Sequence, residues 1–240
     1  MPEVQTSAGP ISYALKRSRR RSLALRVSPD GSIVVNAPRF ALGIFIDRFV
    51  RQQAHWITAQ LRRFAEIARH YPRKQFISGE SYRVDGAEVF LRLIPDGGNP
   101  AETPCALVDG QLEVLLSPAN QGSAEIVKTA LKQWYWKQTE TRVAQAIERF
   151  APPLHVSPRK VRVANQNARW GSCSIQGDLR FNWRLSMAPP AVLDGVVVHE
   201  LAHLRVHDHS PRFWSTVASV LPDYKERRAW LRKYGRSLGF

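Results

Sequence analysis

Two histidines, His199 and His203, stand four residues apart in this chain, with Glu200 directly after the first. Residues four apart lie on one face of a helix, so both imidazoles would point the same way and could hold one zinc ion. Glu200 would then lie beside the metal without ligating it, where it could take a proton from a water that the metal activates. The spacing therefore predicts metal-assisted hydrolysis with Glu200 as the general base.

A third ligand has to approach from another direction to close a tetrahedral site, and His207 and His209 both follow within reach. His207 would continue the row of the same helix. His209 lies beyond the expected helix end, in a turn before the next helix start. We therefore predict that His199, His203 and His209 bind one catalytic Zn²⁺ ion. His207 or Asp208 would orient the site from outside the ligand set.

The alternative to a metal site is a pair of solvated histidines on a helix surface. The run of residues 192–198, VLDGVVV, argues against it because a helix this apolar is expected to be buried. His199 and His203 would then lie at the buried end of the helix.

Composition limits the class of protein. A chain of 240 residues with 44% hydrophobic residues and seven tryptophans is expected to be globular. We expect no membrane span, because no apolar stretch approaches 18 residues, and no signal peptide, because the first residues lack a basic region followed by an apolar one. Cys105 and Cys173 do not suggest a disulfide framework, so the expected location is the reducing cytoplasm.

The net charge of +15 is distributed unevenly. Residues 1–75 carry 14 Lys and Arg against 4 Asp and Glu, residues 76–150 carry 7 against 10, and residues 151–240 carry 14 against 6. A basic surface attracts nucleic acid, nucleotides or acidic proteins, but such a charge also serves solubility alone. The charge leaves both interpretations open.

The residue patterns predict an α+β fold in two domains: a β-rich N-terminal domain carrying one long helix over residues 1–119, and a hydrolase domain over residues 120–240. In the first we expect strands at 11–15, 22–27 and 32–37, with the basic run 16–21 as a hairpin connection and a turn at 29–31. A helix follows at 43–70, then a hairpin turned at Asp85-Gly86, a loop at 95–104 and a strand at 111–116. In the second we expect a helix at 123–150, a strand at 160–164, a hairpin formed by 169–174 and 179–185, and helices starting at Pro190, at Pro211 and after Pro222.

Several segments together resemble the YgjP-like family of predicted metal-dependent hydrolases. They are RWGSCS at 169–174, LRFNWRL at 179–185, VVVHELAHL at 196–204, HSPRFW at 209–214, PDY at 222–224, and, nearer the N-terminus, RSRRRSLALRVSPDGSIVVNAP at 17–38 and FISGESYRV at 76–84. The family is grouped with zincin-like metallopeptidases. Its zinc motif is similar in spacing to that of the SprT-like and WLM proteases, which are linked to repair of DNA–protein crosslinks.

The resemblance implies a zincin-like catalytic domain, in which the active-site helix lies beside a small mixed sheet. His199, His203 and His209 match the family's metal-ligand positions, and Glu200 matches its general base. The chain departs from the metzincin pattern, because Val206 stands where that group has glycine and no Met-turn follows. His209 must therefore be reached through a different turn.

Other residues of these segments could contact the substrate or the transition state. In zincins a sheet edge beside the metal pairs with an extended peptide, and either strand of the 169–185 hairpin could be that edge. Arg169 or Arg184 could stabilise an oxyanion or bind phosphate, and Tyr224 could donate a hydrogen bond to a tetrahedral intermediate. Trp170 and Ser172 are further candidate contacts. For each of these five residues packing is at least as good an interpretation, as it is for Trp183 and Trp214, and Cys173 is better explained as a small buried residue than as a ligand.

The function predicted from the sequence is that of a zinc metallopeptidase acting on peptide or protein substrates. Two alternatives keep the same site: a metal-dependent hydrolase of nucleotides or other phosphoanhydrides, and a DNA-associated protease or nucleic-acid-binding protein that uses the basic surface. The oligomeric state is not predicted.

Overall fold

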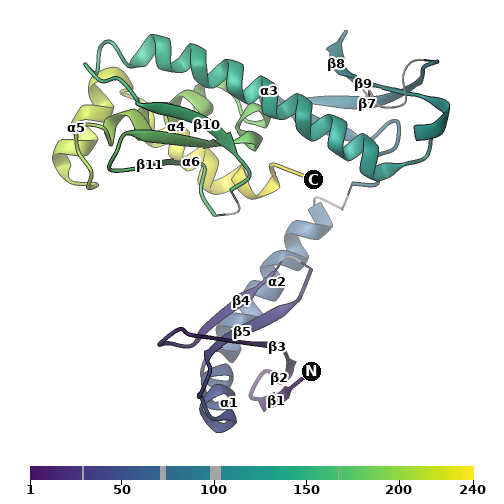
Figure 1. Ribbon diagram of the computed structural model, residues 1–240, viewed down its shortest axis with the longest axis vertical. Helices are drawn as coiled ribbons and strands as arrows, with labels where there is room; N and C mark the ends of the chain where they lie inside the picture. The colour runs from purple at the N-terminus through teal and green to yellow at the C-terminus, as the bar shows by residue number, and fades with distance from the viewer. Residues whose placement is uncertain (29, 71–73, 98–103, 167) are drawn as a thin grey trace. The chain divides into compact units, whose positions relative to one another are not determined.

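The computed structural model describes the chain except for residues 29, 71–73, 98–103 and 167 (Figure 1). Within that part it is a mixed α/β structure with six α-helices and several small sheets. Contacts group the chain into two compact units, Met1–Arg73 and Lys74–Phe240. The turn predicted at 29–31 and the loop predicted at 95–104 fall partly on residues outside this description.

The first unit contains a hairpin of β1 (Glu3–Thr6) and β2 (Gly9–Ser12) and a sheet of β3 (Ala14–Ser18), β4 (Ala24–Val27) and β5 (Ile33–Pro38). The sheet order is β3-β5-β4, with β5 parallel to β3 and antiparallel to β4. The prediction that residues 16–21 form a hairpin connection was therefore wrong, because residues 16–18 are the end of β3 and the chain then passes to β4, with β5 between these two outer strands. β5 is central since it supplies the most deeply buried apolar row, Ile33, Val35 and Ala37.

Two helices occupy the predicted helical region 43–70: α1 (Gly43–Gln52) and α2 (Ala54–His70). The break falls at Gln53, whose backbone N–H donates to the carbonyl groups of Phe49 and Val50. Ile46, Val50, Ala54 and Ile57 are buried in one cluster with the strands of the first unit, which covers the sheet and completes a small core.

The second unit begins with a four-stranded sheet in the order β6-β7-β9-β8. Its strands are β6 (Ser81–Val84), β7 (Ala87–Pro95), β8 (Cys105–Val108) and β9 (Gln111–Leu116), and a 3₁₀ turn, η1 (Pro118–Asn120), follows. The hairpin predicted at Asp85-Gly86 is present, and both residues have positive φ, at 54° and 82°. The backbone N–H groups of this turn donate to the carbonyls of Ser186 and Met187, which ties the sheet to the rest of the unit.

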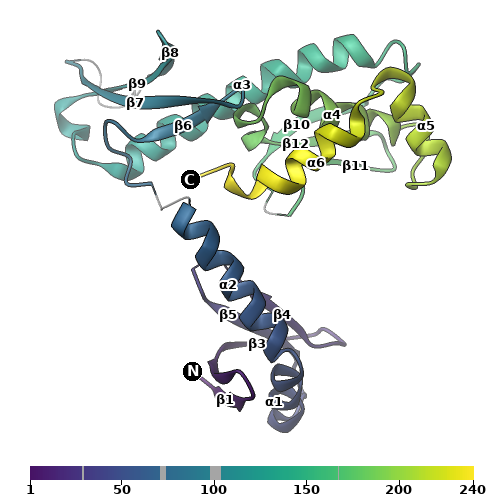
Figure 2. The same ribbon diagram turned by 180° about the vertical axis from the view of Figure 1, so that it is seen from behind.

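The long helix α3 (Ala124–Phe150) joins both halves of the second unit (Figures 1 and 2). Its first half places Val127, Leu131 and Tyr135 in a core with the four-stranded sheet, and its second half places Val143 and Ala146 in a core with α4. The domain boundary that we placed after residue 119 thus falls inside a compact unit. The sheet packs with the C-terminal half because one amphipathic helix supplies the apolar face for both.

The remaining elements surround the predicted motif. A sheet of β10 (Lys160–Ala164), β11 (Gly171–Cys173) and β12 (Asp178–Asn182) has the order β10-β12-β11, and the predicted hairpin of β11 and β12 is present. After the 3₁₀ turn η2 (Trp183–Met187) come α4 (Pro190–Ala202), α5 (Pro211–Val220), α6 (Tyr224–Tyr234) and η3 (Gly235–Ser237). The helices begin at Pro190 and Pro211 as predicted, since proline suits a first helical turn.

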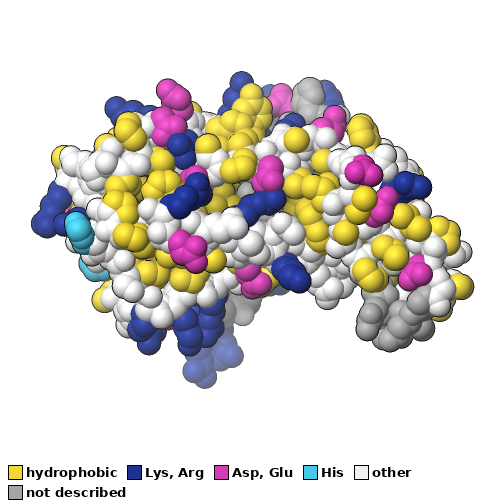
Figure 3. All heavy atoms as spheres, turned by 90° about the horizontal axis from the view of Figure 1, so that it is seen from above, with side chains coloured by type: hydrophobic (Ala, Val, Ile, Leu, Met, Phe, Trp, Pro, Cys, Tyr) yellow, Lys and Arg dark blue, Asp and Glu magenta, His cyan; other side chains and the backbone are white. Residues whose placement is uncertain are grey.

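Charged side chains of both signs are interspersed on the face of the molecule that Figure 3 shows. None of the helices in the described part of the chain is long and apolar enough to cross a membrane.

Two buried hydroxyl groups fasten α3 to η2. Thr139 Oγ1 lies 2.6 Å from the Trp183 carbonyl oxygen, and Ser186 Oγ lies 3.0 Å from the Tyr135 carbonyl oxygen. The hydroxyls are also 3.0 Å from each other. Each can donate to one carbonyl, so the four groups satisfy one another without water.

Removing the Thr139 hydroxyl should destabilise the second unit. Thr139→Val keeps the side-chain shape but removes the 2.6 Å hydrogen bond to the buried Trp183 carbonyl, leaving it the longer 3.3 Å contact with Ser186 Oγ, so the free energy of unfolding should fall by about 1–3 kcal/mol. Urea unfolding would measure the loss. The control is Thr141→Val on the same helix, whose exposed hydroxyl bonds only the Lys137 carbonyl. It should change stability by less than about 0.5 kcal/mol, and equal effects of the two variants would contradict the argument.

Candidate metal centre

Helix α4 carries the first part of the centre and is apolar around most of its circumference. Val192, Leu193, Val197, Val198 and Leu201 are all at most 4% exposed. A helix of this kind is stable only inside a core, where each fully buried side chain contributes roughly 1.5–3 kcal/mol. The polar residues at its C-terminal end are therefore held at the edge of that core.

Asp194 is the buried charged residue near the start of α4, and it ties the helix to its neighbours. Its carboxylate accepts a hydrogen bond from Arg149 of α3 at 2.6 Å and lies 4.0 Å from a guanidinium nitrogen of Arg227 on α6. Burial raises the pKa of Asp194, and the two arginines oppose that rise. The ion pairs thus compensate the cost of burying the carboxylate and fix the helix between α3 and α6.

The structure brings the three predicted ligands together. One nitrogen from each of His199, His203 and His209 can be chosen such that all lie within 4.8 Å of one another, and the Nε2 atoms of His199 and His209 are 3.1 Å apart. Nitrogens bound at about 2.0–2.1 Å to a tetrahedral ion lie roughly 3.3 Å from one another. The His199–His209 distance matches this value, and the 4.8 Å limit places all three imidazoles around one point where a metal ion could be held.

Neighbouring groups fix the orientation of these rings. His203 is the residue that ends α4, and its Nδ1 lies 3.1 Å from the Val206 carbonyl oxygen, so Nδ1–H can donate there and leave Nε2 free for a ligand. The fully buried Phe213 ring lies 4.5–4.9 Å, between centroids, from all three imidazoles. Phe213 forms an apolar floor that restricts the rings.

The protonation states also suit ligation. Burial, together with the smaller effects of His203, His209 and Arg228, lowers the pKa of His199 to about 3. Burial is also the main cause that lowers the pKa of His203. Both rings are neutral at neutral pH, which is the form that binds a metal ion.

His207 and Asp208, the other polar residues of this segment, lie outside the cluster. His207 is exposed and is not among the three converging histidines. Asp208 accepts a hydrogen bond from the Ser210 backbone N–H at 3.1 Å, which shapes the turn between His209 and α5. Asp208 thus orients the chain around His209, a role that the sequence offered to either His207 or Asp208.

Glu200 lies beside the cluster and is 5% exposed. Its burial raises the pKa of the carboxyl group to about 7, and the charge of Arg169 opposes that rise. Strand β11 lies directly against it, because a Cβ added to Gly171 would be 2.6 Å from Glu200 Cγ and Oε1. Only glycine fits at this position without displacing the carboxylate.

The other predicted contacts have different surroundings. Arg169 is exposed and acts on Glu200 through its charge, and the Ser172 hydroxyl accepts from Gln166 at 3.3 Å. Trp170 packs between the two cores of the second unit and against Gly235. Tyr224 stacks on Trp214, with centroids 5.2 Å apart.

Arg184 is engaged away from the centre. Its guanidinium donates to Asn165 at 3.0 Å and lies over the Trp183 ring at 4.5 Å, and burial lowers its pKa. Neither of these partners belongs to the histidine cluster. Gly171 and Phe213 contact residues of the centre, although we did not single them out from the sequence. Both lie inside the resemblance segments, but only their spatial contacts reveal what they do.

A family model described as YgjP-like, metallopeptidase domain, matches residues 21–234 of this chain. The chain belongs to the YgjP-like family. This family is a family of metallopeptidases, so membership implies a bound metal ion and peptide substrates.

Among solved structures, the crystal structure of the metallopeptidase zymogen of Pyrococcus abyssi abylysin is similar to part of the chain. The identity is 24% over 39% of this chain and 93% of that chain, with a TM-score of 0.36. No curated protein matches the sequence.

Removing one ligand should remove the metal. For His203→Ala we expect the zinc content of purified protein to fall from about one ion per chain to near zero, because a three-histidine site with two ligands binds far more weakly. Elemental analysis by mass spectrometry would measure it. His207→Ala is the matched control and should keep its zinc. Unchanged metal content in His203→Ala would contradict the assignment of the site.

Proposed function

We propose that this protein is a zinc-dependent peptidase whose general base is Glu200. The observation that carries the proposal is the convergence of His199, His203 and His209 within 4.8 Å, at the end of a helix that also holds Glu200. Membership in the YgjP-like family supports the peptidase chemistry.

Zinc suits this donor set. Three neutral imidazoles and no further protein ligand are the pattern of catalytic zinc sites, which keep one position open, whereas structural sites are closed by four protein ligands. A zinc ion bound here would supply Lewis acidity that lowers the pKa of water and polarises a carbonyl group. Within the described residues, the histidine cluster is the one group of side chains with such an arrangement.

Glu200 performs the proton transfers in this proposal. Its carboxylate takes a proton from the water that attacks the peptide carbonyl carbon, and the protonated carboxyl group then gives that proton to the leaving amine as the C–N bond breaks. A carboxyl group with a pKa near 7 can do both at neutral pH. Its burial keeps bulk water from competing for the proton.

Strand β11 is the surface that we propose for the peptide. It pairs with β12 on one side, and within the described residues no strand pairs with its other edge, whereas β12 is central. An extended peptide could add to that edge and would then run past Glu200, which touches Gly171 of the same strand. Of the two strands that we considered, residues 169–174 are therefore the better candidate.

Arg169 is the better candidate for stabilising negative charge in the transition state. Its charge acts on Glu200, while Arg184 is occupied by Asn165 and Trp183. Ser172 and Trp170 lie on or next to the same edge strand, where they would contact the peptide.

The first experiment compares the zinc-loaded protein with Glu200→Gln. Turnover should fall by about 10²–10⁴-fold, because glutamine keeps the shape but cannot accept the proton, while the zinc content stays unchanged. The substrates are unfolded proteins and quenched fluorescent peptides, with and without single-stranded DNA, and a panel of nucleoside triphosphates.

The outcomes separate the three functions. Glu200-dependent cleavage of peptides supports the proposal, and stimulation by DNA would add a nucleic-acid role for the basic surface. Glu200-dependent release of phosphate or pyrophosphate without any peptide cleavage would replace the peptidase by a phosphoanhydride hydrolase.

A second variant tests the contact between β11 and the base. Gly171→Ala would force the Glu200 carboxylate to move, so kcat/KM should fall by about 10²-fold at unchanged zinc content, as expected for a misplacement near 1 Å. Gly43→Ala is the control, because a Cβ there meets nothing within 4 Å. Full activity of Gly171→Ala would show that Glu200 does not need its observed position.

A further inference from the structure

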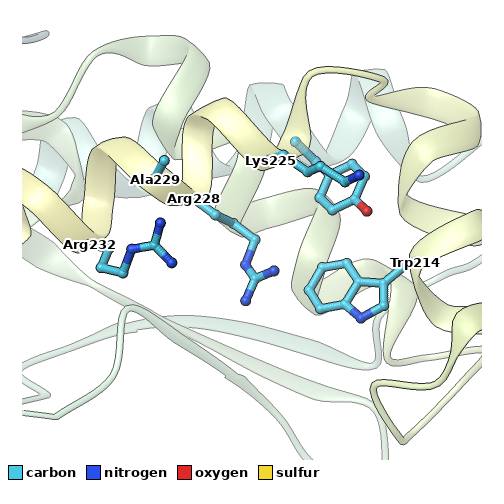
Figure 4. A pocket seen from close by; sticks show the side chains of 6 residues that line it. Trp214, Lys225, Arg228, Ala229 and Arg232 are labelled. Atoms are coloured by element: carbon cyan, nitrogen blue, oxygen red, sulfur yellow. The ribbon is translucent and has the colours of Figure 1, made fainter.

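A second group of functional side chains lies on α5 and α6, next to the histidine cluster. A pocket of about 380 Å³ is lined by Trp214, Tyr224, Lys225, Arg228, Ala229 and Arg232. Figure 4 shows Arg228 and Arg232 extending from α6 on the side where the Trp214 ring lies. The lining thus combines three cationic groups with two aromatic rings.

The three cations occupy one face of α6. Lys225, Arg228 and Arg232 follow at spacings of three and four residues, which places them in one row along a helix. Arg228 lies with its guanidinium carbon 4.2 Å from the Trp214 ring centroid, which fixes its position by a cation–π contact.

These cations are available for a ligand. Within the part of the chain that the structure describes, no carboxylate pairs with any of the three. Their neighbour Arg227 differs, because it donates to Asp223 at 2.9 Å and lies 4.0 Å from Asp194. The helix therefore uses one arginine for packing and leaves a row of positive charge along another face.

Trp214 connects this pocket to the metal centre. Its ring centroid lies 5.7 Å from those of both His199 and His209, and its stacking on the His209 ring has an interplanar angle of 30°. Tyr224 and the Arg228 guanidinium contact the same indole. One aromatic side chain is therefore a wall of both sites.

The distances suit one substrate that spans both sites. The ring centroids of His209 and Trp214 are 5.7 Å apart, and the Arg228 guanidinium carbon is 4.2 Å from the Trp214 centroid. The guanidinium is therefore no farther from the His209 ring than these two distances combined. An extended chain advances roughly 3.3–3.6 Å per residue. A group carried one or two residues from the scissile bond can therefore reach the arginines.

We propose that this pocket binds a carboxylate of the peptide substrate close to the scissile bond, and so gives the enzyme a preference for acidic substrates. The carboxylate belongs either to an Asp or Glu side chain or to the C-terminus of the peptide. Guanidinium groups bind carboxylates through paired hydrogen bonds, and the Trp214 and Tyr224 rings would pack on the aliphatic part of the bound residue. The inference rests on the proposed peptidase function and adds its specificity.

Binding to an inactive enzyme tests this pocket without requiring turnover. Zinc-loaded Glu200→Gln protein is titrated calorimetrically with peptides in which one Glu is moved through successive positions, each matched by a peptide with Gln there and each made with a free or an amidated C-terminus. We expect the best Glu peptide to bind about tenfold more tightly than its Gln counterpart. If the pocket instead takes the C-terminal carboxylate, Glu and Gln peptides should bind alike, and each free peptide should bind about tenfold more tightly than its amidated counterpart.

Variants of the pocket locate the effect. Arg228→Gln and Arg232→Gln, each in the Glu200→Gln background, should reduce the preference to within about twofold while the Gln peptide binds as before. Arg232→Gln guards against an indirect effect of moving Trp214, because within the described part of the chain Arg228 is the cation that lies over that ring. The control is Arg162→Gln, an exposed arginine on β10, which should keep the preference.

The outcomes distinguish this inference from the proposed function. The carboxylate site is overturned if Glu is not preferred over Gln and free peptides are not preferred over amidated ones, if no peptide binds, or if the preference survives both pocket variants, even if active enzyme cleaves neutral peptides. A preference that depends on Arg228 and Arg232, together with no cleavage of any peptide by the active enzyme, would support the site and contradict the peptidase.

Discussion

Burial of α4 is the constraint on which the site depends. Its apolar side chains pack in the two hydrophobic cores of the second unit. The buried carboxylate of Asp194 near its start is paired with arginines from α3 and α6. Because the helix cannot rotate or slide without exposing apolar surface, His199, Glu200 and His203 at its C-terminal end have fixed positions. These side chains thus acquire their preorganisation from the hydrophobic effect rather than from direct bonds between them.

The same rigidity explains how crowded the site is. Phe213 touches all three imidazoles, and Gly171 leaves no room for a methyl group beside Glu200. Close contact excludes water from the carboxylate, which raises its pKa to about 7. In the function that we propose, the same packing would let this one group act as both base and acid at neutral pH.

Trp214 extends this arrangement toward the substrate. Its ring stacks beside His209 and also contacts Tyr224 and Arg228, so the histidine cluster and the cationic pocket share a rigid wall. A substrate anchored by its charge at the arginines would be held at a fixed distance from Glu200. Anchoring of this kind uses binding energy away from the reacting atoms to orient the bond that breaks.

The local features could be predicted from the sequence alone: the motif helix and its start at Pro190, the turn at Asp85-Gly86, the hairpin of β11 and β12, and the three histidines that converge. These follow from spacing, turn chemistry and periodicity, which act over a few residues. Other features became visible only in the folded chain: β5 lies between β3 and β4, α3 unites two cores, Arg184 is engaged elsewhere, and Gly171, Phe213 and Arg228 adjoin the site. Such contacts join residues far apart in the chain, and their pairing depends on which apolar faces meet rather than on any local pattern.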